Sequence, residues 1–247
     1  GVLTDWRTKP AVPFGGKFRI IDFTLSNCMH SGINKICVLT QYKSHSLIQH
    51  LIQGWTKLNS ERGEFLDIIP AQQWTDDETW FQGTADAVYQ SLDIIEGHGP
   101  DYVIILAGDH IYNMDYGEML AQHVNTGADF SVACINIDKE IAAHQYGVME
   151  VDGGGRIIGF EEKPENPKTI PGQDNKVLAS MGIYVVSQSY LAARLRDDAD
   201  LQGSSHDFGR DIIPEGLKRG DHFQAHEFRN PNDEQTPYWR DVGTIDA

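Results

Sequence analysis

Two aspartates occupy positions from which a carboxylate could hold a metal ion. Asp109 follows the apolar run 104–107 and stands in the triplet Gly-Asp-His. A buried parallel strand that ends in Gly-Asp brings a carboxylate to the open edge of an α/β sheet, where such folds bind ligands. Asp241, near the other end of the chain, has a similar apolar-then-polar setting. Two carboxylates from distant segments commonly hold Mg²⁺ on a phosphate-bearing substrate, which indicates phosphoryl or nucleotidyl transfer.

Positive charge is concentrated near the start of the chain. Residues 9–19 contain Lys9, Lys17 and Arg19 together with two prolines. Proline restricts the backbone, so Lys9, directly before Pro10, is held more firmly than a lysine on a free loop. Lys9 could therefore face a polyphosphate. The alternative is a solvated basic loop.

A glycine precedes a predicted helix in the segment 80–88. Gly83 would let a ligand approach the backbone closely, and the helix N-terminus favours anionic or acceptor groups. Thr84 is predicted to be the N-cap. Gln73 offers an amide suited to the edge of a nucleobase. The alternative is an ordinary helix start with surface glutamines.

Further polar residues follow a predicted hairpin. Glu162 and Lys163 end its second strand, where Lys163 would suit a monoester phosphate and Glu162 could accept sugar hydroxyls. An exposed ion-pair cluster is the alternative. Ser180 interrupts an apolar strand, and Asp207 stands where it could cap a helix. No G-x-S-x-G elbow surrounds a serine, so serine-hydrolase chemistry is not indicated.

The frame that must position these residues alternates strands with helices. Apolar periodicity predicts strands over 35–39, 66–69, 102–107, 130–137 and 178–186, and helices over 44–53, 84–96, 116–125 and 188–195. Segments 148–151 and 156–160 flank Asp-Gly-Gly-Gly, a hairpin signal. The pattern predicts an α/β protein, a Rossmann-like doubly wound mixed sheet with an antiparallel hairpin insertion, in one domain over 1–247.

Composition narrows the class of partner. Lys plus Arg number 20 and Asp plus Glu 36, a net charge of −16 that argues against nucleic acid or an anionic membrane as partner. The longest apolar stretch is too short to span a bilayer, and no signal peptide is expected. Cys28, Cys37 and Cys134 are dispersed, as reduced thiols in a cytoplasmic compartment would be. A bacterial cytosol or a plastid stroma would suit this composition.

Seven segments together resemble one family, the ADP-glucose pyrophosphorylases, also called glucose-1-phosphate adenylyltransferases. Single motifs are shared with other sugar-nucleotide pyrophosphorylases, but their combination is specific to this branch. The segments are KPAVPFGGKFRIIDF (9–23), FQGTADAV (81–88), LAGDHIY (106–112), FEEKP (160–164), ASMGIYV (179–185), SSHDFGRDIIP (204–214) and YWRDVGT (238–244).

The resemblance implies that ATP and glucose 1-phosphate give ADP-glucose and pyrophosphate, for glycogen or starch synthesis. An oxygen of the sugar phosphate attacks the α-phosphorus in line, so the rate comes from aligning two anions and neutralising their charge. The resemblance assigns a catalytic role to Asp109, Lys9 and Lys163. It assigns a magnesium ion (Mg²⁺) to Asp109 and Asp241; ATP to Lys9, Gln73, Gly83, Thr84 and Asp109; and glucose 1-phosphate to Gly147, Glu162, Lys163, Ser180, Asp207 and Trp239.

Members of this family begin with a strand and a phosphate loop of the form GGxGTRL, and continue past YWRDVGT into a β-helix. Neither segment is found in this sequence, so we expect a catalytic domain that is inactive without its N-terminal loop. The family also implies a homotetramer and allosteric control.

Three other functions stay open. A uridylyl- or thymidylyltransferase is possible, because Gly83 and Gln73 do not by themselves select a purine. A metal-dependent glycosyltransferase would usually show Asp-x-Asp, whereas this chain has Gly-Asp-His. A catalytically silent regulatory subunit or scaffold would tend to lose Asp109, Lys163 or Asp241, and all three are present.

Overall fold

A computed structural model describes residues 7–41, 43–56, 58, 60–71, 81–229 and 238–241, with the backbone alone at Asp241. Internal contacts divide the chain into two compact units. Unit 1 comprises residues 1–81, 107–117 and 238–247, and unit 2 comprises residues 82–106 and 118–237. Each unit is described by itself below.

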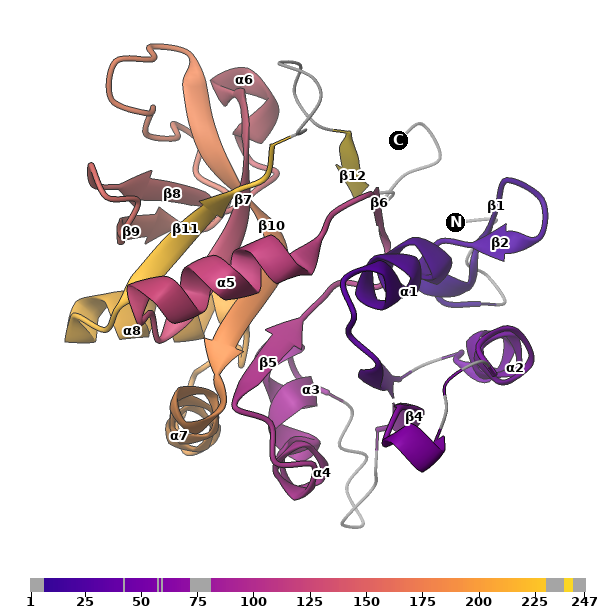
Figure 1. Ribbon diagram of the computed structural model, residues 1–247. Helices are drawn as coiled ribbons and strands as arrows, with labels where there is room; N and C mark the ends of the chain where they lie inside the picture. Colours follow the sequence, from indigo (N-terminus) through magenta and orange to yellow (C-terminus); the bar gives the residue numbers. More distant parts are fainter. Residues whose placement is uncertain are drawn as a thin grey trace. The chain divides into compact units, whose positions relative to one another are not determined.

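Unit 2 is built on a six-stranded mixed sheet (Figure 1). Its path is β11-β7-β10-β8-β9, and β5 pairs with β10 off this path. The β11–β7 pair is parallel and the other pairs are antiparallel. The strands are β5 (Tyr102–Ile105), β7 (Phe130–Asp138), β8 (Val148–Val151), β9 (Ile157–Glu161), β10 (Lys176–Ser187) and β11 (Phe223–Glu227).

Helices cover both faces of this sheet, as the doubly wound prediction required. Ser131 on β7 hydrogen-bonds His123 of α5, 2.8 Å between Oγ and Nδ1, whereas the neighbouring Phe130 stacks on Phe223 and lies against Phe208. Successive strand residues face opposite sides, so α5 and η3 cover opposite faces. The helices are α3 (Thr84–Gln90), α4 (Leu92–Gly97), α5 (Tyr116–Thr126), α6 (Lys139–Ala142), α7 (Gln188–Ala199), η3 (Phe208–Ile212) and α8 (Ile213–Arg219).

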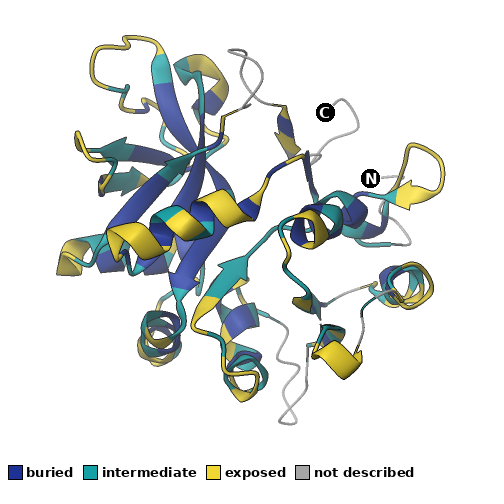
Figure 2. Cartoon of the chain, in the orientation of Figure 1, coloured by how far each residue is buried: buried dark blue, intermediate teal, exposed yellow. Residues whose placement is uncertain are grey.

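Burial follows from this layering (Figure 2). The strand β10 is apolar along almost its whole length, because a strand covered on both faces has no solvent side. In α5, Met119 and His123 are buried while Val124 is about half exposed. Residues four apart share one face of a helix, which makes α5 a surface helix with one buried side.

The predicted hairpin is present as the antiparallel pair β8–β9, at the end of the sheet path. Asp152 stabilises its turn, where the carboxylate oxygen Oδ1 accepts hydrogen bonds from the backbone N–H groups of Gly154 and Arg156. This is the local hydrogen bonding that favours aspartate in turns.

Unit 1 contains shorter elements. The parallel pair β3–β4 confirms the predicted strands near 35–39 and 66–69, and α2 confirms the helix predicted over 44–53. The elements are η1 (Lys9–Ala11), β1 (Pro13–Phe14), β2 (Phe18–Arg19), α1 (Ile21–His30), β3 (Lys35–Thr40), α2 (His45–Gly54), η2 (Ser60–Arg62), β4 (Phe65–Pro70), β6 (His110–Tyr112) and β12 (Trp239–Asp241).

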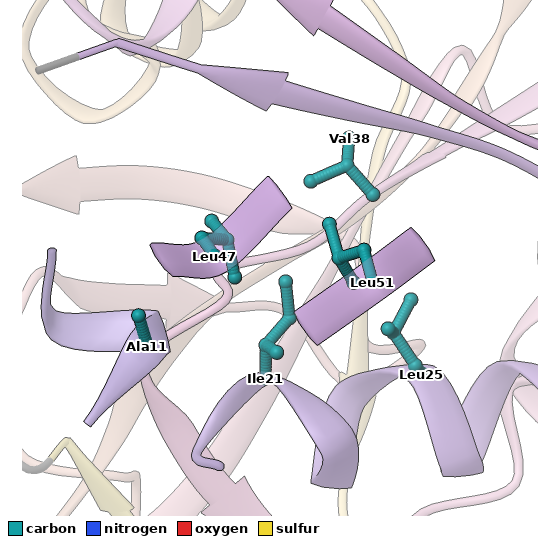
Figure 3. Close-up of a cluster of buried hydrophobic side chains, with 6 residues drawn as sticks. All are labelled: Ala11, Ile21, Leu25, Val38, Leu47 and Leu51. Atoms are coloured by element: carbon teal, nitrogen blue, oxygen red, sulfur yellow. The ribbon is translucent and has the colours of Figure 1, made fainter. Parts of the chain in front are cut away.

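A small apolar cluster joins η1, α1, β3 and α2 (Figure 3). Leu47 and Leu51, one turn apart on α2, point towards Ile21 and Leu25, which are likewise one turn apart on α1. Ala11 at the end of η1 is fully buried against the same cluster. The segment that carries Lys9 is thereby packed onto the two helices.

Two predicted boundaries are wrong. The strand predicted over 102–107 ends at Ile105, is half buried, and pairs antiparallel with β10 rather than lying in a buried parallel arrangement. An apolar run does not encode the direction of its neighbour. The helix predicted over 84–96 breaks at Ser91, whose hydroxyl donates to the Ala87 carbonyl, 3.0 Å away. Such a back-bond competes with continued helix.

No helix among the described residues combines the length and apolarity needed to cross a membrane.

Candidate active site

In unit 1, the Gly-Asp and Lys-Pro motifs lie against each other. Gly108 packs on the ring of Pro10, where a Cβ on Gly108 would lie 3.4 Å from the proline Cγ. The Lys9 Nζ lies 3.7 Å from Asp109 Oδ2, with side chains 45% and 27% exposed. An ion pair this loose and open contributes little to stability. Both charges therefore stay accessible to ligands of opposite sign.

The second aspartate reaches the same neighbourhood through strand pairing. β12 runs antiparallel to β6 and places Asp241 opposite His110, the residue after Asp109. The Trp239 ring, opposite Tyr112 in the register, lies edge-on to His110 with 5.1 Å between ring centroids. The segment YWRDVGT thus pairs with LAGDHIY, although more than a hundred residues separate them.

The donor set fits Mg²⁺. The described residues contain no group of three or more His, Cys, Asp or Glu that could hold a metal ion. Magnesium retains several waters and uses one or two carboxylates plus phosphate oxygens, so one or two aspartates would suffice for an ion that is also bound by phosphate.

Helix α1 holds the segment that carries Asp109. Thr24 Oγ1 donates to the Ala107 carbonyl at 3.0 Å, and Asn27 Nδ2 donates to the Tyr112 carbonyl at 3.2 Å. Both ends of this segment are therefore tied to one helix, which limits the positions that the Asp109 turn can take.

Arg19 positions the turn that carries Lys9, a role that sequence analysis missed. Its Nη1 donates to the carbonyl of Ala11 at 2.7 Å, two residues after Lys9. Arg19 is one of three cations in the segment 9–19, and nothing in the sequence distinguishes a cation that faces a ligand from one that holds the backbone.

Arg19 is in turn held by the buried carboxylate of Asp22. The Arg19 backbone N–H donates to Asp22 Oδ2 at 2.8 Å. His50 Nε2 and Trp55 Nε1 donate to Asp22 Oδ1 at 2.7 and 2.8 Å. Buried charge persists where hydrogen bonds compensate it, and here they link α1 with α2 and the residue after it.

In unit 2, Lys163 has a strained backbone. Its φ is +49°, and only four described non-glycine residues, among them Lys163 and His206, have positive φ. The Lys163 N–H donates to the carbonyl of Tyr146 at 3.2 Å, and the carbonyl of Pro164 accepts from the N–H of His144 at 3.1 Å. These bonds hold a conformation that costs about 1–3 kcal/mol, of the kind often found at functional sites.

Two glycines make room for the carboxylate of Glu162. A Cβ on Gly147 or on Gly209 would lie 2.9 Å from Glu162 Oε2. Burial raises the pKa of Glu162; Lys163, with Nζ 4.0 Å from Oε1, opposes the rise, and Asp207 adds to it. The result is a partly desolvated carboxylate with a lysine beside it.

Ser180 lies beside Gly147, at an irregularity in β10. Its N–H donates to the Gly147 carbonyl at 2.7 Å, and the β10–β7 register shifts between Ser180 and Tyr184. Gly182 supplies the positive φ of +66° that this bulge requires. The serine is thereby placed next to Gly147, which itself lies against the Glu162 carboxylate.

The structure corrects the predicted role of Thr84. The N-cap of α3 is Gly83, and Thr84 is the first helical residue. The Thr84 hydroxyl donates to Asp207 Oδ2 at 2.9 Å and accepts from the Phe208 N–H at 3.1 Å. Asp207 is a helix cap as predicted, because its Oδ1 accepts from the N–H groups of Gly209 and Arg210.

The start of α3 is occupied by the protein itself. The carbonyl of His206 accepts from the N–H groups of Ala85 and Asp86, at 2.8 and 3.3 Å. A Cβ on Gly83 would lie 2.2 Å from that carbonyl oxygen. Glycine is required here by the close approach of another loop, and the prediction that these helix donors face a ligand is wrong for Ala85 and Asp86.

The predicted site residues therefore form two groups. In unit 1, Lys9, Asp109, Trp239 and the Asp241 backbone belong to one neighbourhood. In unit 2, Gly147 contacts Glu162 and Ser180, and Lys163 lies beside Glu162. Gly83 and Thr84 contact the loop of Asp207. Gln73 lies outside the described residues.

Comparison with known proteins shows the family to which the chain belongs. The model of the family described as nucleotidyl transferase matches residues 2–247. The chain is 58% identical over 245 residues to "Glucose-1-phosphate adenylyltransferase 2" of Alkalilimnicola ehrlichii, covering 99% of this chain and 57% of the relative. It is 54% identical over 248 residues to the glucose-1-phosphate adenylyltransferase of Nitrosomonas europaea, again covering 99% and 57%. The chain spans little more than half the length of these relatives.

Proposed function

We propose that this chain, which belongs to the nucleotidyl transferase family, transfers an adenylyl group from ATP to glucose 1-phosphate and releases ADP-glucose and pyrophosphate. The curated relatives it resembles carry the name of that activity. The observation that carries the proposal is the β6–β12 register, which sets Asp241 opposite the neighbour of Asp109.

Lys9, Asp109 and Asp241 act on the nucleotide in this proposal. Asp109 and Asp241 would hold Mg²⁺, which supplies positive charge to the phosphates when bound. Lys9 faces the ATP phosphates and neutralises part of their charge. Arg19 keeps the Lys9 turn in place through the Ala11 carbonyl. Gln73, Gly83 and Thr84 belong to the nucleotide side, and Trp239 packs beside His110.

The unit 2 residues around Glu162 take glucose 1-phosphate. Lys163 binds the phosphate, and the carboxylate of Glu162 accepts sugar hydroxyls. Gly147, Ser180 and Asp207 shape the wall around that carboxylate. A phosphate oxygen of the sugar then attacks the α-phosphorus of ATP, and pyrophosphate leaves. Orientation and charge neutralisation supply the rate, since the protein contributes no covalent group.

We infer further properties from the family resemblance and the composition. The complete protein would act in the cytoplasm, as an allosterically controlled homotetramer in glycogen or starch synthesis. Its strongly negative net charge favours small anionic substrates bound at local cationic sites over nucleic acid or anionic membranes as partners.

The test is pyrophosphate release by the complete protein with glucose 1-phosphate and ATP, UTP or dTTP side by side. We expect turnover with ATP to exceed the others. Preference for UTP or dTTP would overturn the adenylyl assignment and favour the alternative nucleotidyltransferases. Release of a nucleoside diphosphate from a nucleotide sugar would indicate a glycosyltransferase, and no turnover at all a regulatory subunit.

A further inference from the structure

In unit 2, the buried carboxylate of Asp198 holds the loop 204–208 through hydrogen bonds. The side chain of Asp198, near the end of α7, is only 8% exposed. Its Oδ1 accepts from the Ser204 hydroxyl and its Oδ2 contacts His206 Nδ1, both at 2.7 Å. A carboxylate can only accept, so Nδ1 of His206 carries the proton. Both oxygens of the buried carboxylate are thereby satisfied, which such a group requires.

This contact fixes an unusual backbone at His206. Its φ is +51°, in the left-handed region that a non-glycine residue rarely adopts. The His206 N–H donates to Ser204 Oγ at 3.0 Å, so side chain and main chain are held by the same pair of residues. Such a conformation persists only where its surroundings hold it.

The fixed backbone of His206 positions residues that the proposed function assigns to the nucleotide. With His206 in this conformation, its carbonyl accepts from the N–H groups of Ala85 and Asp86 and lies against Gly83. No side chain caps α3. The helix start that carries Gly83 and Thr84 therefore takes its position from His206.

The same backbone also positions residues that the proposed function assigns to the sugar phosphate. Asp207 follows His206 directly, and its carboxylate holds the Thr84 hydroxyl and the N–H groups of Gly209 and Arg210. Gly209 in turn lies against the carboxylate of Glu162. A rotation at His206 would therefore move groups on both sides.

We propose that His206, held by Asp198, is a positioning residue that sets the nucleotide-side residues Gly83 and Thr84 and the sugar-side residues Asp207 and Glu162 together. The inference rests on the proposed function and extends it, because neither His206 nor Asp198 is among the residues assigned to a substrate. Releasing His206 weakens the binding of ATP and of glucose 1-phosphate at once.

The experiment compares His206→Ala, His206→Asn and the exposed neighbour variant Ser205→Ala in the complete protein. Asparagine tolerates the left-handed backbone and keeps a donor for Asp198. We expect KM for both substrates to rise about five- to twentyfold in His206→Ala with kcat changed less than threefold, and His206→Asn to recover most of the loss. Ser205→Ala should match the wild type.

A double-mutant cycle locates the effect in the Asp198 contact. Asp198→Asn should raise both KM values in the same way, and the double variant Asp198→Asn/His206→Ala should be no worse than His206→Ala alone. Additive losses would overturn the coupling of the pair.

Amide hydrogen exchange supplies a readout independent of turnover. We expect faster exchange at Ala85 and Asp86 in His206→Ala, while exchange in the strand β7 stays unchanged. Faster exchange throughout the unit would show a general loss of stability and overturn the positioning role.

The outcomes separate this inference from the proposed function. If the wild type is active but His206→Ala raises neither KM, or only one of the two, the coupling alone is overturned. A wild type that releases no pyrophosphate would overturn the proposed function and this inference with it.

Discussion

The two units hold their candidate site residues in contrasting ways. In unit 1, Lys9 and Asp109 lie 3.7 Å apart, and the lysine is nearly half exposed. In unit 2, Asp207 receives the Thr84 hydroxyl at 2.9 Å, and Asp198 holds His206 at 2.7 Å. Unit 1 has a hydrogen-bonded frame with a loosely paired lysine and aspartate. In unit 2 the Asp207 and Asp198 carboxylates are held by short hydrogen bonds, whereas the Lys163–Glu162 pair, 4.0 Å between Nζ and Oε1, is as loose as the pair in unit 1.

This contrast has a physical reason. Phosphates and a divalent cation carry large charges, so side chains that receive them must exchange one ionic partner for another at low cost. A sugar is recognised by hydrogen bonds of defined direction, which require groups whose positions are already set. The comparison therefore predicts large losses of rate from unit 1 and losses of binding from unit 2.

The largest effect is expected in unit 1, at Asp109. Asp109→Asn keeps the size of the side chain and removes the charge, so we expect turnover to fall about a thousandfold, as loss of metal-based charge stabilisation should cause. Steady-state pyrophosphate release measures it, with Glu118→Gln on the exposed side of α5 as control. Near-normal turnover would contradict the metal role of Asp109.

A smaller effect, mainly on binding, is expected in unit 2 at Lys163. Lys163→Ala removes the charge that is proposed to bind the sugar phosphate, and KM for glucose 1-phosphate should rise about 10–100-fold while kcat changes less. Lys168→Ala is the matched control, because Lys168 is an exposed lysine paired with Glu150. An unchanged KM in Lys163→Ala would indicate that Lys163 only forms an exposed ion pair with Glu162.

The smallest effect concerns stability and pH at Glu162. Burial raises the pKa of this carboxyl above its usual 4.5, so the ionised form is disfavoured in the folded state. As pH falls, the folded protein takes up this proton before the unfolded chain does, and the destabilisation present at neutral pH disappears. Glu162→Gln should therefore raise Tm by about one to three degrees at pH 7, with no gain below about pH 4.

Two measurements complete that prediction. Thermal unfolding of Glu162→Gln against Glu161→Gln, a neighbouring exposed carboxylate, isolates the buried site. For the wild type, KM for glucose 1-phosphate should rise as pH falls through the raised pKa of Glu162, because the protonated carboxyl is a poorer acceptor. A destabilised Glu162→Gln at pH 7 would contradict the desolvation of this group.

Regular elements were the most predictable part of the fold. The strand β10 and the hairpin β8–β9 follow from local apolar pattern and turn chemistry, and both were confirmed. The break at Ser91 was not predicted, because a serine inside an apolar-periodic helix carries no signal for its back-bond to Ala87. The predicted direction of β5 was wrong because an apolar run carries no signal for the direction of the strand beside it.

Site residues divide in the same way. Asp207 was predicted as a cap, since its carboxylate serves N–H groups two and three residues further along the chain. Thr84 was assigned the wrong partner, because its hydroxyl bonds a residue more than a hundred positions away. The support given by Arg19 to the Lys9 turn, and by Asp198 to His206, escaped prediction altogether.

By itself the sequence determined which chemistry the chain can carry, because carboxylates, lysines and glycines at strand ends and helix starts are local properties. It determined the family as well, because the motifs and their order along the chain can be recognised without the structure. Only the tertiary structure decided which of these groups lie together and which hold the backbone. Gly83 shows why: the carbonyl that excludes a side chain from it belongs to a distant loop, and hydrogen-bond partners across space leave no local pattern in the chain.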